Sequence, residues 1–178
     1  MKIRTGQFVA MLTAFLLLYA CGSSEPDEIG QGDVAPAWQG TTFDGASVSF
    51  PELLEGKPAV FVVWATWCNY CKAFMPYLEA IQAEYGTDRI NVLAINAKED
   101  GTGDPAEYVA ELDFPMIAVR DGDDIAAAYD VEYIPGLFVI DADGMIAYRR
   151  AWTELPAGEQ VGSLWAIQVR QSLNSLLN

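Results

Sequence analysis

The sequence predicts an α/β protein in which a mixed β-sheet is flanked by helices. The continuous apolar run over residues 58–65 lacks the alternation of a half-exposed strand and is typical of a strand buried on both faces, and residues 90–95 indicate another buried strand. Apolar residues recur at helical spacing over 71–85 and again over 159–177. Segments of the two kinds alternate along most of the chain, and this order is characteristic of α/β architecture.

Local signals place the remaining elements. An Asp-Gly turn at 44–45 lies between two β-prone stretches, so residues 37–50 are predicted to form a hairpin. Pro105 occupies a first-turn position of a helix, and the charged pair Arg149-Arg150 is expected at a strand edge. The elements expected after the hairpin are a helical turn at 51–54, strands at 58–65, 90–95, 116–119, 137–140 and 145–149, and helices at 68–86, 104–112, 124–129 and 159–177.

The composition limits both the size and the partners of this protein. The chain has 178 residues, of which 52% are hydrophobic and 20% charged, and this suits one domain with a substantial core. Its formal charge of −15 argues against nucleic-acid binding, which needs clustered Lys and Arg, and against a basic patch that docks on anionic lipid. The absence of histidine excludes Ser-His and Cys-His catalysis and histidine-ligated metals.

The N-terminus has the pattern of a leader. Lys2 and Arg4 precede an apolar run over 8–20, which is shorter than the roughly 20 residues that a membrane span needs. The residues that follow, 18–22, resemble a bacterial lipobox, and this resemblance implies that Cys21 is acylated and becomes the new N-terminus. The alternative is an ordinary signal peptide followed by an incidental cysteine.

We therefore divide the chain into a lipoprotein signal peptide (1–20), a polar tether (21–33) and a domain (34–178). Acyl chains on Cys21 would act as a lipid anchor, because two chains hold a protein at a membrane where one does not. The expected location is the bacterial envelope, with the domain facing the periplasm or another extracytoplasmic space. Disulfide chemistry is possible there.

The remaining cysteines, Cys68 and Cys71, carry the candidate chemistry. A Cys-x-x-Cys pair between a buried strand and a helix places Cys68 at the helix N-terminus, where free backbone N–H groups and the helix dipole stabilise a thiolate. Cys71 lies about one turn further along and can attack a mixed disulfide formed at Cys68. Lys72 is the basic side chain beside the pair. Since one cysteine pair without histidine is a poor metal site, we expect no metal and no cofactor.

The string Trp-Ala-Thr-Trp-Cys-Asn-Tyr-Cys-Lys at 64–72, with Ile134-Pro135 and residues 138–144 downstream, resembles the thioredoxin superfamily. The branch it resembles is that of the TlpA/ResA/DsbE-type membrane-anchored proteins. The resemblance implies a thioredoxin-like fold with an N-terminal β-hairpin and an inserted strand–helix unit. It also implies that Pro135 is cis and lies against the disulfide, so that the backbone groups of Ile134 can pair with an extended client chain.

The same resemblance implies a thiol–disulfide oxidoreductase with Cys68 and Cys71 as its catalytic residues. Cysteine-containing client proteins, with apocytochromes c among them, and a membrane electron-donor protein are the implied partners. The direction of electron flow stays open, because the Asn-Tyr dipeptide between the cysteines replaces the commoner Gly-Pro type. The residues assigned to client contact are Trp67, Asn69, Tyr70, Ile134 and Pro135.

Two positions depart from the family pattern. Thioredoxins have a buried carboxylate where this chain has Val62, and TlpA-type proteins often have Glu where it has Phe74. Such a carboxylate transfers the proton of the buried thiol, and Glu79, Glu132 or bulk water could take over that step. The departures keep a second function open, that of a thioredoxin-fold binding lipoprotein whose disulfide is only structural.

Overall fold

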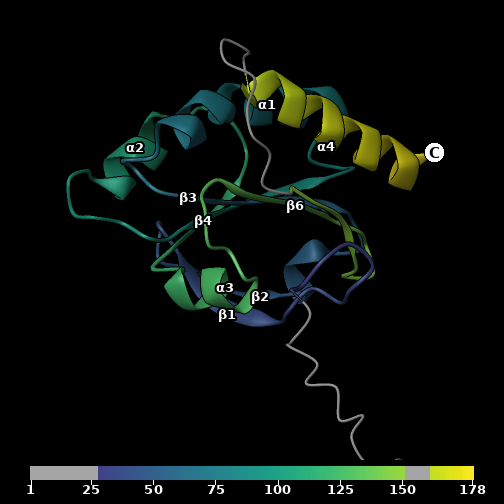
Figure 1. Ribbon diagram of the computed structural model, residues 1–178, viewed down its shortest axis with the longest axis horizontal. Coiled ribbons are helices and arrows are strands. Elements are labelled where there is room, and N and C mark those ends of the chain that lie inside the picture. The colour runs from purple at the N-terminus through teal and green to yellow at the C-terminus, as the bar shows by residue number, and fades with distance from the viewer. Residues whose placement is uncertain (1–27, 151–160) are drawn as a thin grey trace, which may run out of the picture.

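The computed structural model of the protein describes residues 28–150 and 161–178 (Figure 1). These residues form a mixed sheet of seven strands in the order β2-β1-β5-β4-β3-β6-β7. The strands are β1 (Trp38–Thr42), β2 (Ser47–Phe50), β3 (Ala59–Trp64), β4 (Asn91–Asn96), β5 (Ile117–Arg120), β6 (Gly136–Ile140) and β7 (Ile146–Arg149). The helices are the short 3-10 turn η1 (Glu52–Leu54), α1 (Asn69–Tyr85), α2 (Pro105–Glu111), α3 (Asp123–Ala128) and α4 (Val161–Leu177).

This architecture confirms the predicted fold class and the predicted order of elements. The expected hairpin over 37–50 is formed by β1 and β2, which pair antiparallel. Strand β3 pairs parallel with β4 and antiparallel with β6, so the sheet is mixed. Between β4 and β6 the chain forms α2, β5 and α3, where the resemblance implies an inserted strand–helix unit. The first residues of the helix predicted over 159–177 lie outside the described residues.

Helices and the hairpin cover both faces of the sheet. Figure 1 shows α1 and α4 on one face and α3 on the other. In β3, Val60 and Trp64 pack in the core beneath α1 and α4, whereas Phe61 and Val63 pack in the core beneath α3. Since successive side chains of a strand point to opposite faces, a strand that is covered on both sides must be apolar at every position. The coverage of β3 on both faces explains the continuous apolar run over residues 58–65.

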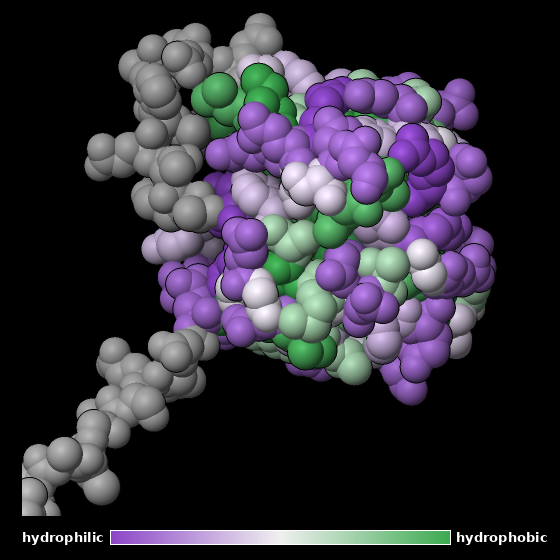
Figure 2. Space-filling view, turned by 90° about the vertical axis from the view of Figure 1, so that its right-hand side faces the viewer, coloured by the Kyte–Doolittle hydropathy of each residue, from purple (hydrophilic) through white to green (hydrophobic). Residues whose placement is uncertain are grey.

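The outer surface carries the charge. Figure 2 shows a face on which hydrophilic residues predominate and apolar residues form only an interrupted band. This distribution agrees with the formal charge of −15 of the whole chain.

Residues 28–33, whose composition assigns them to the polar tether, lie along β7. The backbone N–H of Ile146 donates to the carbonyl of Asp33 over 2.9 Å, and Arg149 forms an ion pair with Glu28. Backbone groups can pair whatever the side chains are, so a polar composition does not keep this segment away from the sheet. Residues 28–33, which the sequence assigns to the tether, are therefore bound to the domain.

The predicted signal peptide over 1–20 and the predicted lipidation site Cys21 lie outside the described residues. Within the part of the chain that the structure describes, no helix is long and apolar enough to cross a membrane. The division of the chain into leader, tether and domain stays a prediction.

Candidate active site

The cysteine pair lies where β3 ends and α1 begins. Cys68 is the N-cap of α1, and Cys71 lies within its first turn. The two sulfurs form a disulfide, with 5.2 Å between the Cα atoms. The backbone N–H of Cys71 donates a hydrogen bond to Sγ of Cys68 over 3.1 Å. In the reduced protein this donor and the positive end of the helix dipole would stabilise a thiolate at Cys68.

The local backbone explains how the sequence reaches this arrangement. After the last buried residues of β3, the chain turns so that the N–H of Cys68 donates to the carbonyl of Ala65 over 3.2 Å. The carbonyl of Cys68 then accepts from the N–H of Lys72 over 3.1 Å, which is the first hydrogen bond of α1. Because the first N–H groups of a helix have no partner within the helix, the sulfur of the N-cap residue is a natural acceptor.

Both sulfurs are largely shielded in the oxidised protein. Cys68 is 4% exposed and Cys71 1%, whereas the neighbouring Trp67 and Tyr70 are 44% and 55% exposed. Asn69 is exposed as well. The two cysteines therefore differ only slightly in solvent exposure. The stronger asymmetry is electrostatic, because Sγ of Cys68 accepts the amide hydrogen bond at the helix N-terminus.

The second part of the site is the peptide bond between Ile134 and Pro135, which is cis as the resemblance implies. Strand β6 begins at Gly136, opposite Val63 of β3, so this peptide lies beside the end of β3 from which the cysteine pair follows. Pro135 is buried, Ile134 is half-buried, and Tyr133 is 60% exposed. The cis-proline segment and the disulfide therefore share one edge of the sheet.

A carboxylate that the sequence patterns do not single out holds the turn before the cysteine pair. Glu99 accepts hydrogen bonds from the backbone N–H of Thr66 over 2.8 Å, from the Thr66 hydroxyl, and from the side-chain amide of Asn96. Thr66 and Asn96 are both 5% exposed, so these donors need an acceptor inside the protein. The indole N–H of Trp67 donates to the carbonyl of Lys98 over 2.6 Å. The loop after β4 is thus fastened to the active-site turn.

One signal in the sequence could have indicated Glu99. It lies three residues after the end of β4, and β4 runs parallel to β3 with Asn96 opposite Trp64. Carboxyl ends of neighbouring parallel strands meet at one edge of a sheet, where α/β proteins place their sites. An acid just after a buried strand was therefore a candidate for the edge that carries the cysteines.

Helix α2 forms one wall of an open groove of about 470 Å³ beside the cysteine pair. The Lys72 ammonium lies 5.8 Å from the ring centroid of Tyr108 in α2, and Tyr108 packs against Trp64. Burial raises the pKa of the Tyr108 hydroxyl, and the nearby charge of Glu111 acts in the same direction. The basic side chain beside the cysteines is therefore directed at α2. The groove is lined by Thr66, Trp67, Asn69, Lys72, Thr102, Gly103, Asp104, Glu107, Tyr108 and Glu111.

The two positions that depart from the family pattern belong to the hydrophobic core. Val62 is 1% exposed and Phe74 is fully buried, with its ring edge-on to Trp165 at 5.8 Å between centroids. Glu79 and Glu132, the acids considered as replacements, are exposed. The carboxylate that contacts the active-site turn is instead that of Glu99, in the loop after β4.

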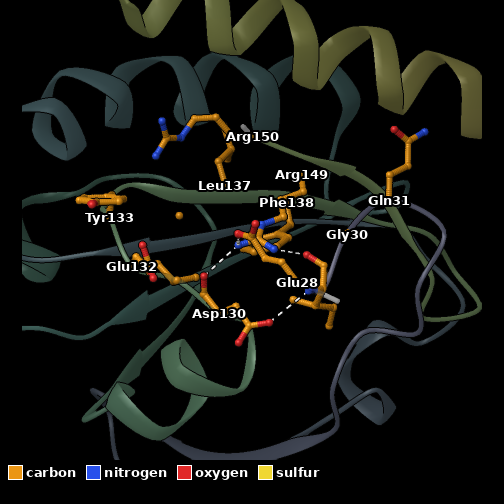
Figure 3. A pocket seen from close by; sticks show the side chains of 13 residues that line it. Glu28, Gly30, Gln31, Asp130, Glu132, Tyr133, Leu137, Phe138, Arg149 and Arg150 are labelled. Carbon is orange, nitrogen blue, oxygen red and sulfur yellow. Dashed lines mark hydrogen bonds and ion pairs between the residues drawn. The ribbon is translucent and has the colours of Figure 1, made fainter. Parts of the chain in front are cut away.

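A cavity of about 440 Å³ lies below the cis-proline segment, between residues 28–31, the loop 130–133 and the strands β6 and β7 (Figure 3). Its polar groups largely pair with one another. Arg149 donates to the backbone carbonyls of Ile29 and Asp130, and the Asp130 carboxylate accepts from the N–H of Ile29 over 3.1 Å. These bonds connect the N-terminal segment with the loop that leads to Pro135.

Within residues 28–150 and 161–178, no three His, Cys, Asp or Glu side chains are grouped so that they could hold a metal ion.

A disulfide at the N-terminus of the helix that follows a central strand, beside a cis-proline edge, defines the thioredoxin-fold thiol–disulfide oxidoreductases. The chain belongs to the AhpC/TSA family, whose model matches residues 31–149. Similarity to proteins of known activity agrees with the site, and the chain is a thiol–disulfide oxidoreductase.

Three comparisons show the extent of this similarity. The chain is 26% identical over 151 residues to a thiol-disulfide oxidoreductase ResA of Bacillus cereus, covering 78% of this chain and 86% of the relative. It is 31% identical over 133 residues to the thioredoxin-like protein YneN of Bacillus subtilis, covering 72% and 76%. The solution structure of a thiol:disulfide interchange protein from Bacteroides sp. shares the fold, with a TM-score of 0.62 at 20% identity over 80% and 92% of the two chains.

Proposed function

We propose that this protein exchanges disulfides with cysteine-containing client proteins outside the cytoplasm, while a lipid at Cys21 anchors it to the bacterial envelope. The observation that carries the proposal is the position of Cys68, which caps α1 and accepts the backbone N–H of Cys71. A disulfide that only braces a fold has no need of a sulfur that is activated in this way. The exposed aromatic side chains Trp67 and Tyr70 beside it suit contact with a polypeptide.

The exchange can be written with bonds and electrons in balance. The reduced Cys68 thiolate attacks one sulfur of a client disulfide; the client S–S bond breaks, a bond from Cys68 to the client forms, and the other client sulfur leaves as a thiolate. The Cys71 thiolate then attacks Sγ of Cys68, which closes the internal disulfide and releases the second client sulfur. Two electrons pass from the cysteine pair to the client, and the reverse sequence oxidises a client dithiol.

The client chain would be held at the cis-proline edge. Ile134 is half-buried and adjoins the start of β6, so its backbone groups can pair with an extended client segment next to the disulfide. Trp67, Asn69 and Tyr70 are exposed on the other side of the cysteines and would contact the client side chains.

The proposed place of action rests on the sequence. The leader pattern over 1–20 and the lipobox-like Cys21 favour an envelope location, in which a membrane electron-donor protein would restore the reduced pair. On the resemblance to TlpA/ResA/DsbE-type proteins, we include the maturation of c-type cytochromes, with apocytochromes c as clients.

A trapping experiment tests the proposal. In the Cys71→Ser variant the second step is blocked, so mixed disulfides between Cys68 and clients should accumulate in an envelope extract and disappear on reduction. The Cys68→Ser variant, which keeps Cys71, serves as the matched control and should trap nothing. Absence of adducts with Cys71→Ser, or equal adducts with both variants, would contradict the proposed exchange.

A further inference from the structure

Two consecutive arginines at the end of β7 act on opposite faces of the sheet. Arg149 bonds to the carbonyls of Ile29 and Asp130, whereas Arg150 reaches toward the helices that cover the other face (Figure 3). This follows from the alternation of side chains along an extended chain. The two arginine side chains therefore bind different parts of the protein.

The guanidinium of Arg150 holds the carbonyl of the cis-proline. Its Nε and Nη2 atoms both donate to the Pro135 oxygen, at 2.9 and 2.6 Å. The backbone N–H of Arg150 donates to the carbonyl of Leu137 over 2.8 Å, so its own main chain is fixed to β6. One residue thus clamps the chain directly after the cis peptide, from the neighbouring strand.

Within residues 28–150 and 161–178, the Arg150 guanidinium has few other partners. It lies 4.9 Å from the ring centroid of Trp165 in α4, which is 4% exposed and meets the buried ring of Phe74 edge-on. The ion pairs in the described part of the chain involve other side chains. Burial lowers the pKa of Arg150. A cation that is removed from water needs good acceptors, and here these are the ring of Trp165 and the Pro135 carbonyl.

We propose that Arg150 is a positioning residue for client docking: by fixing the Pro135 carbonyl it orients the backbone groups of Ile134 that pair with the client chain. This inference rests on the proposed function, in which the client binds at that edge. Arg150 touches neither the sulfurs nor the client in this account, and it acts through the cis-proline segment.

The proposal separates two kinds of substrate. A protein disulfide has to pair with the Ile134 edge, so loss of the clamp should raise KM for a protein client and leave kcat nearly unchanged. A small aromatic disulfide such as 5,5′-dithiobis(2-nitrobenzoate) reacts with the Cys68 thiolate without pairing to a strand edge. Its rate should therefore not depend on Arg150.

The experiment compares Arg150→Met with Arg120→Met in the full chain. Methionine at 150 still covers Trp165 but donates no hydrogen bond, and we expect KM for insulin to rise about ten-fold, with the reaction of the small disulfide within about two-fold of wild type. Arg120→Met loses the same charge from an exposed side chain on β5 that pairs with Asp121, and it should change neither value. The ratio of the two rates in one sample is independent of the folded fraction. Arg150→Lys keeps the positive charge but has one donor nitrogen in place of the two that bind Pro135, and it should restore part of the loss.

Each result decides a different question. Equal loss with insulin and with the small disulfide, or an unchanged KM in Arg150→Met, would contradict the positioning role while wild type remains active on insulin. A wild-type chain that reacts with the small disulfide but not with insulin would instead contradict the proposed function, and the inference with it.

Discussion

The two sides of the disulfide are held by side chains of opposite charge. On the side of the attacking cysteine, the Glu99 carboxylate accepts hydrogen bonds from the turn at Thr66. On the side of the cis-proline, the Arg150 guanidinium donates to the carbonyl of Pro135. Each charge matches the backbone group that it binds. The turn before a helix has unpaired N–H groups, which donate to a carboxylate, whereas the Pro135 carbonyl accepts from a guanidinium.

The comparison separates chemistry from docking. Glu99 fixes the chain that carries the reactive sulfur, so every exchange reaction depends on it. Arg150 fixes the chain that the proposed client pairs with, so only polypeptide substrates depend on it. A site that exchanges disulfides with proteins needs a fixed reactive sulfur and a fixed docking segment. In this account Glu99 holds the first and Arg150 holds the second.

The largest expected effect comes from Glu99→Ala. The variant leaves the buried N–H and hydroxyl of Thr66 without an acceptor, and we expect a loss of about 3 kcal/mol in the free energy of unfolding. Because the turn before Cys68 loosens, the rates with insulin and with a small disulfide should fall together. Urea unfolding of the oxidised protein and the two rate assays measure these effects.

Asp100→Ala is the matched control for that prediction. Asp100 is the next residue of the same loop and is exposed, and among the described residues its side chain bonds to the backbone and hydroxyl of Thr102. Its removal should leave the free energy of unfolding close to that of the wild type. Similar losses at both positions would show that the carboxylate of Glu99 has no special part in holding the turn.

The second prediction tests whether the two sides are independent. Glu99 follows β4 and Arg150 follows β7, and the order β4-β3-β6-β7 separates these strands by three steps of about 4.8 Å each. Residues this far apart usually contribute additively. In the double variant Glu99→Gln/Arg150→Met the losses in kcat/KM for insulin, each converted to a free energy as RT ln of the ratio to wild type, should sum to within about 0.5 kcal/mol. A larger coupling energy would mean that the two sides form one unit.

The smallest effect concerns Tyr148, which lies on β7 two residues before Arg150. Its hydroxyl donates to the side chain of Gln168 over 2.8 Å, and burial raises its pKa to about 12, while the charge of Arg150 acts in the opposite direction. Between about pH 10 and 12 the unfolded chain has lost a proton that the folded chain keeps, so stability falls as the pH rises through this window. Tyr148→Phe should remove that part of the fall.

The same tyrosine reports on the charge beside the cis-proline. Arg150→Met should move the ultraviolet titration of Tyr148 to higher pH, because a nearby positive charge is lost, whereas Glu99→Gln should leave it in place. A titration that responds equally to both variants would be inconsistent with two separate sides.

Much of the fold could be predicted from the sequence, because its causes are local. The run over 58–65 is apolar at every position, and the run over 90–95 at every position but Asn91, since both faces of β3 and β4 are covered. The position of Cys68 at a helix N-terminus follows from the strand before it and the helical spacing after it. The predicted elements agree with the structure to within a few residues.

The supporting residues of the site could not be predicted in this way. Glu99 acts across a parallel pairing of β3 with β4, and no local pattern specifies which strands become neighbours. Arg150 was expected at a strand edge, and β7 does end the sheet, but its partner Pro135 lies 15 residues earlier, directly before the adjoining strand β6. Cis proline is likewise a minority form without a local signal; the resemblance indicated Pro135, and the second cis bond, before Pro51, was not foreseen.

The most direct test of the account is residue-resolved alkylation of the reduced full chain at neutral pH. The central claim is that the sulfur capping α1 is activated and its neighbour is not. We therefore expect iodoacetamide to modify Cys68 at least about ten times faster than Cys71, with a rate that reports a thiol pKa below that of free cysteine. Equal, slow modification of the two sulfurs would contradict the claim and leave the disulfide with a structural role only.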